Sequence, residues 1–342
     1  MSAQSNVVIL FGGTSSERMV SVASGQHLAA IWPEAELWFW SPAGKILSVD
    51  ASELAAHQKV FDSEFAPSRA ITVGATVEAA LDQASGKVFY LGLHGGDGEN
   101  GWLQERLEAR KICFTGSSAA ASALAMNKSK SKDAVRPRGA LMARQLVFVP
   151  KEAGAAKSLA EFQKSVGELV IKPSSEGSSA GLAFIKGAAD CDAWFETNKF
   201  SGATWLAEER IYGRELTVGV MAHKGCLTVL PPSEVILERN ANFDYQAKYL
   251  GVGNKEITPA ELTLAQATAA QELSILAHTA IGCFGYTRTD MIMTQKGMYY
   301  LETNTLPGMT KASFIPQQLA AAGVSVRDFV AGQIELAKRR YE

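Results

Sequence analysis

Two continuous apolar runs near the start of the chain, at residues 7–11 and 88–93, predict strands that are buried on both faces. Each run leads into a glycine-rich segment. A pattern typical of a helix follows each of them, over about 17–31 and about 103–109. Strands that alternate with helices predict an α/β domain with a parallel sheet over roughly the first 120 residues.

The pattern changes after residue 126, where short apolar strands follow one another. Residues 240–254 are polar and aromatic without clear periodicity, which indicates a long loop, and long loops are often functional. Helices are predicted at about 259–281 and 325–340. The short strands form a predicted antiparallel set at 169–172, 182–186, 205–209, 216–221 and 227–230.

A hairpin near the C-terminus carries the strongest chemical signal. Its strands are predicted at 288–293 and 300–304, joined by a three-residue loop, 295–297, that ends in glycine. Side chains alternate between the faces of a strand, so residues 288, 290, 302 and 304 share one face if Lys296 is the middle of the loop.

This register places Asp290 opposite Glu302 and Arg288 opposite Asn304. Two carboxylates that face each other across a ladder destabilise it unless a cation lies between them. Carboxylate and amide oxygens are ligands that Mg²⁺ prefers, with water and phosphate oxygens completing its coordination. The hairpin therefore predicts a metal–phosphate site. The alternative, a charged pair on a solvated surface, does not explain why all four side chains share one face.

Length and composition narrow the class of protein. The 342 residues fit two or three domains, and 47% hydrophobic with 20% charged residues is typical of a soluble globular protein. A net charge of −2 gives no reason to expect nucleic acid or an anionic membrane as a partner. The four cysteines are far apart, which predicts reduced, buried thiols. No signal peptide or membrane-spanning run is visible, so we expect a cytoplasmic protein.

Two glycine-rich loops follow the apolar strands. Residues 12–17 could hold an anion or substrate at a helix N-terminus, or form an ordinary strand–helix turn. Residues 94–101 contain four glycines, and His94 lies at the carboxyl end of a predicted parallel strand, where α/β sheets bind ligands. We therefore interpret this second loop as functional, against the alternative of a structural histidine.

Three further segments suggest a nucleotide site. Lys172 precedes a small-residue flap, 173–181, that could wrap a polyphosphate or be a long hairpin turn. Acidic residues at 208–215 could bind adenine or ribose, although acids at a strand end are more often solvated. Aromatic residues at 243–249 could form a lid over substrate, or anchor their loop to the core.

In their order along the chain, these motifs resemble the D-alanine–D-alanine ligase family of the ATP-grasp superfamily. The resemblance extends from the first strand almost to the C-terminus, and residues 304–310 are its most specific string. The matching residues are Phe11-Gly12-Gly13, Glu17, Arg18, Val20, Ser21, His94-Gly95, Gly98-Glu99, Thr115-Gly116-Ser117, 123–128, Lys172-Pro173, Glu176-Gly177-Ser178-Ser179, Asp244-Tyr245, Ala247-Lys248-Tyr249 and Asn304-Thr305-Leu306-Pro307-Gly308-Met309-Thr310.

The resemblance implies an ATP-grasp fold, α/β with an α+β ATP-binding part, behind a Rossmann-like parallel-sheet domain. It implies domains at 1–122, 123–213 and 214–342. Implied ATP contacts are Lys128, Lys172, Glu176, Ser178, Glu208, Glu209, Ile211, Glu215 and Lys248. Implied ligands of two Mg²⁺ ions, with Mn²⁺ as a substitute, are Asp290, Glu302 and Asn304. Implied catalytic residues are Glu17, Ser178, Tyr249, Arg288, Gly308 and Ser313, with His94 and Phe314 beside the substrates.

The implied activity is ATP-dependent formation of D-alanyl-D-alanine for peptidoglycan synthesis, through an acylphosphate, by a homodimer. A ligase of the same family that uses D-lactate or D-serine as second substrate is the nearest alternative, and Tyr249 favours D-alanine. A third alternative is a nucleotide-binding regulator without catalysis, but such a regulator would have no need of Arg288. The sequence departs from the usual family pattern at Asn100, Asn127, Gln246 and Phe314.

Overall fold

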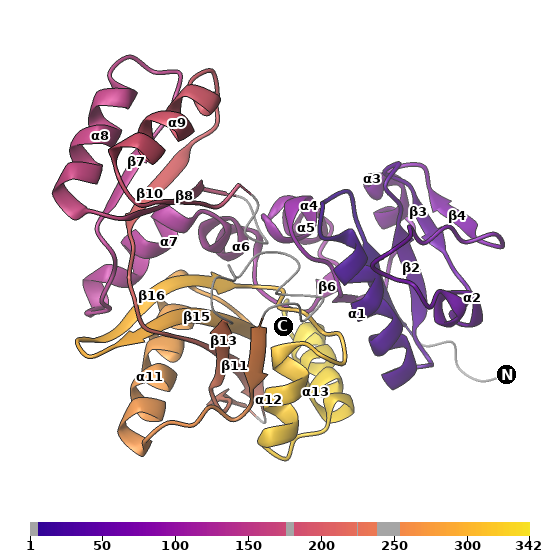
Figure 1. The fold of residues 1–342 in the computed structure, drawn as a ribbon. Helices are drawn as coiled ribbons and strands as arrows, with labels where there is room; N and C mark the ends of the chain where they lie inside the picture. The colour runs from indigo at the N-terminus through magenta and orange to yellow at the C-terminus, as the bar shows by residue number, and fades with distance from the viewer. Residues whose placement is uncertain (1–5, 176–180, 224, 238–253) are drawn as a thin grey trace, which may run out of the picture.

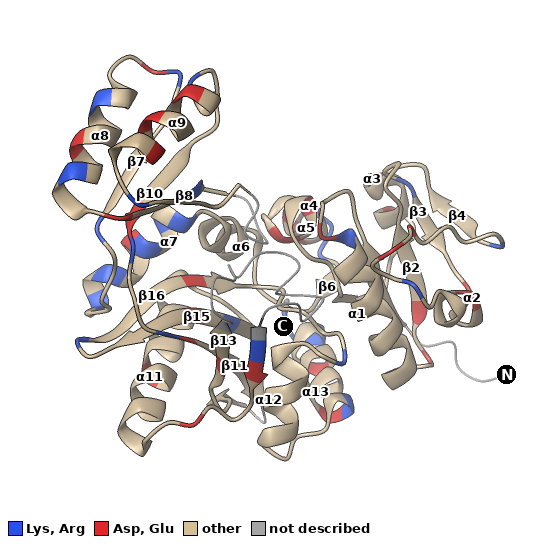
Figure 2. Ribbon diagram, viewed as in Figure 1, with Lys and Arg blue, Asp and Glu red and all other residues tan. Residues whose placement is uncertain are grey.

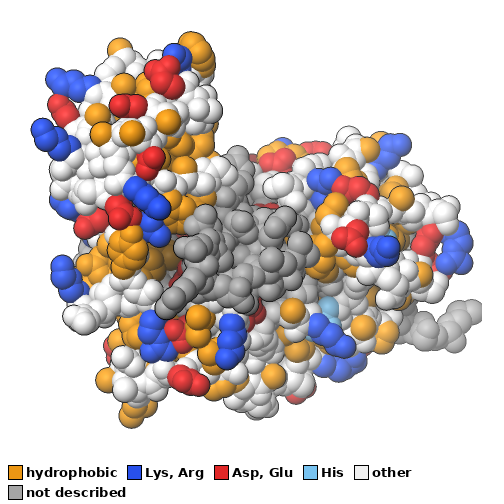
Figure 3. All heavy atoms as spheres, viewed as in Figure 1, with side chains coloured by type: hydrophobic (Ala, Val, Ile, Leu, Met, Phe, Trp, Pro, Cys, Tyr) orange, Lys and Arg blue, Asp and Glu red, His pale blue; other side chains and the backbone are white. Residues whose placement is uncertain are grey.

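The strands of this protein form three sheets, which lie in three successive parts of the chain (Figure 1). The structure, a computed structural model, describes residues 6–175, 181–223, 225–237 and 254–342. Within these residues no helix is long and apolar enough to cross a membrane. Acidic and basic side chains are interspersed over the described part of the face shown in Figure 3.

The first sheet has the strand order β4-β3-β2-β1-β5-β6. β1 pairs in parallel with β2 and β5, and β5 pairs in parallel with β6. The strands are β1 (Val7–Gly12), β2 (Glu36–Trp40), β3 (Ile46–Ser48), β4 (Ile71–Gly74), β5 (Val88–Leu91) and β6 (Cys113–Phe114).

The prediction of a parallel sheet is confirmed for four strands and wrong for the edge formed by β3 and β4, which are antiparallel to their neighbours. The five-residue connection between β2 and β3 is too short for the crossover that parallel strands need. Helices associated with this sheet are α1 (Arg18–Ile31), α2 (Ala51–Ala56), α3 (Val77–Leu81), α4 (Gly96–Glu99) and α5 (Trp102–Ala109).

The second sheet is antiparallel, in the order β7-β10-β8-β9, and carries two helices that the sequence pattern did not reveal. Leu159, Ile171 and Trp205 belong to its core, and the rings of Trp194 and Trp205 meet edge to face at 4.9 Å. The elements are β7 (Gln145–Phe148), α8 (Ala155–Val166), β8 (Leu169–Pro173), β9 (Ala183–Ile185), α9 (Ala188–Asn198) and β10 (Trp205–Glu209).

The third sheet is also antiparallel, in the order β14-β13-β11-β15-β16, and β12 pairs with β11. The five strands predicted as one antiparallel set are therefore divided between two sheets, a correction of that prediction. The strands are β11 (Arg214–His223), β12 (Cys226–Val229), β13 (Ser233–Leu237), β14 (Asn254–Ile257), β15 (Tyr286–Thr294) and β16 (Gly297–Asn304).

Side-chain alternation gives the third sheet two different faces. Leu216, Val218 and Met291 face a core shared with α11, α6 and α7. The opposite face of β11 packs against α12. The two are so close that a Cβ added at Gly219 would come 2.7 Å from Ile315. The helices are α6 (Ala119–Met126), α7 (Lys128–Val135), α11 (Leu264–Ile281), α12 (Phe314–Ala321) and α13 (Val326–Lys338).

The predicted helix at 259–281 begins only at Leu264, because Thr263 and Gln266 form a capping box there.

The last helix joins the first and third sheets. Phe329 of α13 lies edge to face with Tyr286 at 5.1 Å, and Tyr286 stacks with Tyr90 of β5 at 6.4 Å. The apolar core is therefore continuous from β5 to the C-terminal helix.

The prediction of buried thiols holds for Cys191 and is wrong for Cys226, which is exposed.

Candidate active site

The hairpin β15–β16 has the register that the sequence predicts at its chemically important end. Asp290 pairs with Glu302, and Arg288 pairs with Asn304. The predicted three-residue loop is wrong, because Thr294 pairs with Gly297 and leaves only two residues in the turn. A bulge between Asp290 and Met291 adds one residue on β16 and restores the predicted pairing beyond it.

The opposed carboxylates each have a cation beside them. The guanidinium of Arg288 donates two hydrogen bonds of 2.9 Å to Asp290, and Lys128 Nζ lies 3.2 Å from Glu302 Oε2. Asp290 also accepts hydrogen bonds from Thr217 Oγ1 at 2.5 Å and from Asn304 Nδ2 at 3.1 Å. The expected neutralisation of this acidic pair is thus provided by side chains of the chain itself.

Glu208, at the end of β10, is buried and is not a solvated acid, which corrects the local interpretation made from the sequence. Lys172 Nζ lies 2.6 Å from its Oε2, and Lys132 Nζ donates to its Oε1. Asn127 caps α7, because its side chain accepts a hydrogen bond from the backbone N–H of Lys130. Figure 2 shows the basic positions of α7 beside the acidic end of β10.

The His94 loop joins the first sheet to the segment that follows β16. His94 Nδ1 lies 2.9 Å from the carbonyl oxygen of Leu306, so this nitrogen carries the proton, and Nε2 accepts from Ser24 Oγ at 2.9 Å. Burial lowers the pKa of His94, which favours this neutral ring. His94 therefore has a structural role in addition to any contact with substrate.

Two acidic side chains lie in the same loop region. Glu99 is buried and accepts hydrogen bonds from the backbone N–H groups of Gly95, Thr305 and Leu306. Burial and the nearby carboxylate of Glu17 raise the pKa of Glu99 to about 7. Gly95 has a φ of +64°, and a Cβ there would come 2.3 Å from Glu17 Oε2, so only glycine fits.

The loop before α12 brings Gly308 and Ser313 to the cavity that Arg288 lines, and Phe314, the first residue of α12, lines it too. Ser313 Oγ accepts a hydrogen bond from the backbone N–H of Thr310 at 3.1 Å. A Cβ added at Gly308 would come 2.7 Å from this hydroxyl oxygen. A cavity of about 490 Å³ is lined by Arg288, Asp290, Gly308, Ser313, Phe314, Glu215 and Glu256.

Comparison with known proteins identifies the family that has this arrangement of residues. Residues 6–117 match the family described as "D-ala D-ala ligase N-terminus", and residues 146–335 match "D-ala D-ala ligase C-terminus". The chain belongs to the D-alanine–D-alanine ligase family.

Known relatives align with nearly the whole length of this chain. The D-alanine–D-alanine ligase of Syntrophobacter fumaroxidans is 34% identical over 97% of each chain. The crystal structure of the D-alanine–D-alanine ligase of Bacillus anthracis has a TM-score of 0.74, is 26% identical and covers 97% of each chain. The VanG D-Ala:D-Ser ligase of Enterococcus faecalis is 24% identical, with a TM-score of 0.80 over 98% of this chain and all of that one, and shows the shared ATP-grasp fold.

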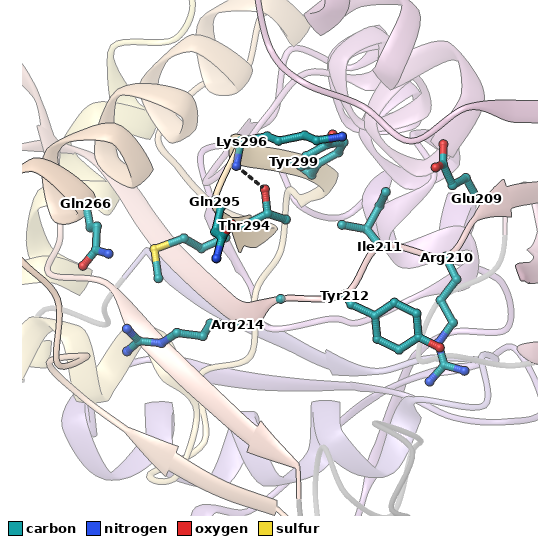
Figure 4. A pocket seen from close by; sticks show the side chains of 12 residues that line it. Glu209, Arg210, Ile211, Tyr212, Arg214, Gln266, Thr294, Gln295, Lys296 and Tyr299 are labelled. Carbon is teal, nitrogen blue, oxygen red and sulfur yellow. Dashed lines mark hydrogen bonds between the residues drawn. The ribbon is translucent and has the colours of Figure 1, made fainter. Parts of the chain in front are cut away.

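Three of the ATP contacts implied for this ligase line cavities, and they line two different ones. Glu215 lines the one that contains Arg288, whereas Glu209 and Ile211 line a second cavity of about 640 Å³ at the connection between β10 and β11. Figure 4 shows Ile211 and Tyr212 opposite Tyr299 across this second cavity. Four implied site residues, Glu176, Ser178, Lys248 and Tyr249, lie outside the described residues, as does the whole of the predicted lid, 243–249.

Several residues around the ligase site were not found from the sequence. Lys132 is one helical turn after Lys128, a spacing that places both on one face of a helix and could have revealed it. Glu256 lines the same cavity as Ser313 and accepts a hydrogen bond from Gln317 at 2.9 Å. Burial raises the pKa of Glu256. No motif marks Glu256 or Thr217, because only the fold brings them to the site.

Proposed function

We propose that this chain joins two molecules of D-alanine at the expense of ATP, giving D-alanyl-D-alanine, ADP and phosphate for peptidoglycan synthesis. The observation that carries this function is the shared face of Arg288, Asp290, Glu302 and Asn304, with Lys128 beside Glu302. Family membership over nearly the whole chain supports it. A regulator without catalysis would have no use for an arginine in the cavity that Gly308 and Ser313 line.

Asp290, Glu302 and Asn304 would hold the Mg²⁺ ions that accompany ATP. The donors fit, because two carboxylates and one amide supply oxygen ligands and leave room for phosphate and water. Among the described residues no group of three or more His, Cys, Asp or Glu could hold a metal ion, so this site would depend on the amide of Asn304 and on ligands from the nucleotide. When bound, Mg²⁺ neutralises charge on the transferring phosphoryl group.

The chain's own residues have separable tasks in this reaction. Lys128 and Lys172 bind phosphate oxygens in place of their present partners, Glu302 and Glu208. The carboxylate of the first D-alanine attacks the γ-phosphate, which yields an acylphosphate and ADP. Glu17 binds the ammonium group of this first D-alanine. Positioning supplies most of the acceleration in phosphoryl transfer.

The second half-reaction takes place at the other end of the cavity. The amine of the second D-alanine attacks the acyl carbon, and phosphate leaves through a tetrahedral intermediate. Arg288 and the backbone N–H of Gly308 stabilise the oxyanion of that intermediate. Ser313 binds the carboxylate of the second D-alanine, and Phe314 lies near its methyl group. Both side chains line the cavity with Arg288, which supports these roles.

We further propose three domains, 1–122, 123–213 and 214–342, a homodimer and a cytoplasmic location. The three sheets follow the proposed domain order. Helices α6 and α7 share their core with the third sheet, so they attach the second part of the chain to the third. Sedimentation at several protein concentrations tests the dimer, because a dimer sediments at twice the monomer mass of 36.6 kDa.

Phosphate release with purified protein tests the activity and its alternatives. We expect release with ATP, Mg²⁺ and D-alanine, and a D-alanyl-D-alanine product by mass spectrometry. Release that requires D-lactate or D-serine together with D-alanine would assign the second substrate instead. Release with none of these amino or hydroxy acids, despite ATP binding, would leave the regulator as the function.

A further inference from the structure

Lys132 on α7 is a buried lysine to which the reaction above gives no task. Its side chain has 0% exposure, and its ammonium group donates a hydrogen bond to Glu208 Oε1. The other oxygen of the same carboxylate lies 2.6 Å from Lys172 Nζ. Glu208 is 3% exposed. One buried carboxylate is thus shared between two lysines, and the three side chains together carry one positive charge.

These charges belong to parts of the fold with separate cores. Lys132 lies on α7, whose buried Val135 packs in the core of the third sheet. Glu208 and Lys172 lie on β10 and β8 of the second sheet. Lys128, one turn earlier on α7, pairs with Glu302 of β16 at 3.2 Å. α7 therefore places one lysine against a carboxylate of each sheet.

Charge balance gives the two lysines around Glu208 different tasks. A buried carboxylate that loses its partner costs several kcal/mol, by general experience with buried ion pairs. If Lys172 turned to a nucleotide phosphate and Lys132 were absent, Glu208 would be left without a cation. Glu208 would then compete with the phosphate for Lys172. Burial and the like charge of Lys172 lower the pKa of Lys132, whereas the carboxylate of Glu302 raises it.

We propose that Lys132 is a positioning residue that neutralises Glu208 and thereby releases Lys172 to bind the phosphates of ATP. This role rests on the proposed function, because it presupposes that Lys172 meets the nucleotide. It makes nucleotide affinity depend on a side chain that has no exposed surface. It also predicts that the effect of Lys132 is confined to the phosphate end of the nucleotide.

The test compares the affinities of a non-hydrolysable ATP analogue with Mg²⁺ and of adenosine, measured by calorimetry or competition. The ratio of the two affinities reports the phosphate contacts alone. We expect Lys132→Met to lower this ratio about tenfold or more, the range for a hydrogen bond to a charged group. Lys132→Arg, which keeps the charge, should retain more of the ratio. Lys130→Met, on the exposed side of the same helix, is the matched control and should leave it unchanged.

A double variant separates positioning from simple support of the fold. Lys132→Met with Glu208→Gln removes both charges of the pair, so Lys172 has no buried competitor and the ratio should return to within about threefold of the wild-type value. This variant also decides the matter if Lys132→Met alone fails to fold. A ratio that stays about tenfold low in the double variant, or that is unchanged in Lys132→Met, overturns the proposal.

Measurements on the wild-type protein distinguish failure of the proposed function from failure of the positioning role alone. If it neither binds the ATP analogue nor forms the dipeptide, the proposed function fails. If it does both while the affinity ratio is insensitive to Lys132, only the positioning role fails. A lowered melting temperature in Lys132→Met with an unchanged ratio assigns Lys132 to the structure alone.

Discussion

The guanidinium of Arg288 donates two hydrogen bonds of 2.9 Å to the carboxylate of Asp290, two residues farther along β15. The proposed oxyanion-binding group and a proposed metal ligand therefore form one charge-paired unit. Lys128 and Glu302 form a second unit on the facing side. Because neither pair belongs to the apolar clusters, removing a charge from either should affect chemistry more than folding.

We predict that Glu302→Gln abolishes dipeptide formation at ordinary Mg²⁺ concentrations and leaves the fold intact. The variant loses a metal ligand and the partner of Lys128, but no apolar contact. A partly exposed ion pair contributes on the order of 1 kcal/mol, so the melting temperature should fall by at most about 4 °C. Phosphate release and circular dichroism measure the two effects. Glu272→Gln, on an exposed position of α11, is the control. Near-normal turnover in Glu302→Gln would remove Glu302 from the metal site.

Phe314 should determine selectivity for the second amino acid. Its side chain is 8% exposed, lines the cavity, and its ring centre lies 5.7 Å from the Arg288 guanidinium carbon. A methylene is worth roughly 1–3 kcal/mol in an apolar pocket, or about 10–200-fold in kcat/KM. We expect the wild type to prefer D-alanine to D-2-aminobutyrate as second substrate. Phe314→Leu should relax this preference more than it changes use of the first D-alanine. An unchanged selectivity ratio with a lower melting temperature would show that Phe314 only packs.

His94→Ala should weaken both stability and use of the first D-alanine. The variant leaves the Leu306 carbonyl without its donor and the Ser24 hydroxyl without an acceptor for its proton, and unsatisfied buried groups cost about 1–3 kcal/mol. The loop that carries Gly308 follows Leu306, so its position should also change. Chemical denaturation and steady-state kinetics at varied D-alanine measure the two consequences. Unchanged stability would contradict the structural role of His94.

His278 should make the protein less stable in acid. Burial lowers the pKa of His278 to about 4, from an ordinary value of 6.5, and its Nδ1 lies 2.8 Å from Thr287 Oγ1. The unfolded chain takes up a proton below pH 6.5 while the folded chain does not until about pH 4. The free energy of unfolding should therefore fall as pH decreases from 6.5 to 4, by on the order of 3 kcal/mol.

The comparison that isolates this effect uses His278→Gln, which cannot be protonated. The difference in unfolding free energy between wild type and variant should change across pH 6.5 to 4 and be constant above pH 7.5. Because His278 lies on the α11 side of the third sheet, away from Arg288, activity at pH 7.5 should be equal in both proteins. A pH-independent difference would show that His278 titrates normally in the folded chain.

The hairpin shows how far a local pattern can predict a site. Alternation and a loop centre at Lys296 were enough to pair Asp290 with Glu302, and the structure confirms that pairing. The prediction succeeded although the turn contains two residues, because a bulge compensates for the shorter loop. A bulge has no signature in this sequence, so the compensation could not be foreseen.

Glu208 shows the limit of local patterns. An acidic residue at a strand end is typically solvated, and no feature of residues 205–211 indicates otherwise. Its burial comes from α7, which is about 75 residues earlier in the chain and supplies Lys132. The same reason hides Glu256 and Thr217, which reach the cavity from separate strands.

The sequence by itself determined the elements whose information is local. Apolar runs defined the buried strands β1 and β5, and the order of the motifs determined the family. The tertiary structure decided which strands share a sheet, and it divided one predicted antiparallel set between two. It also decided which charges are buried together, as in Lys132, Glu208 and Lys172. Side-chain periodicity depends on neighbours along the chain, whereas the pairing of buried charges depends on distances between segments, which only packing sets.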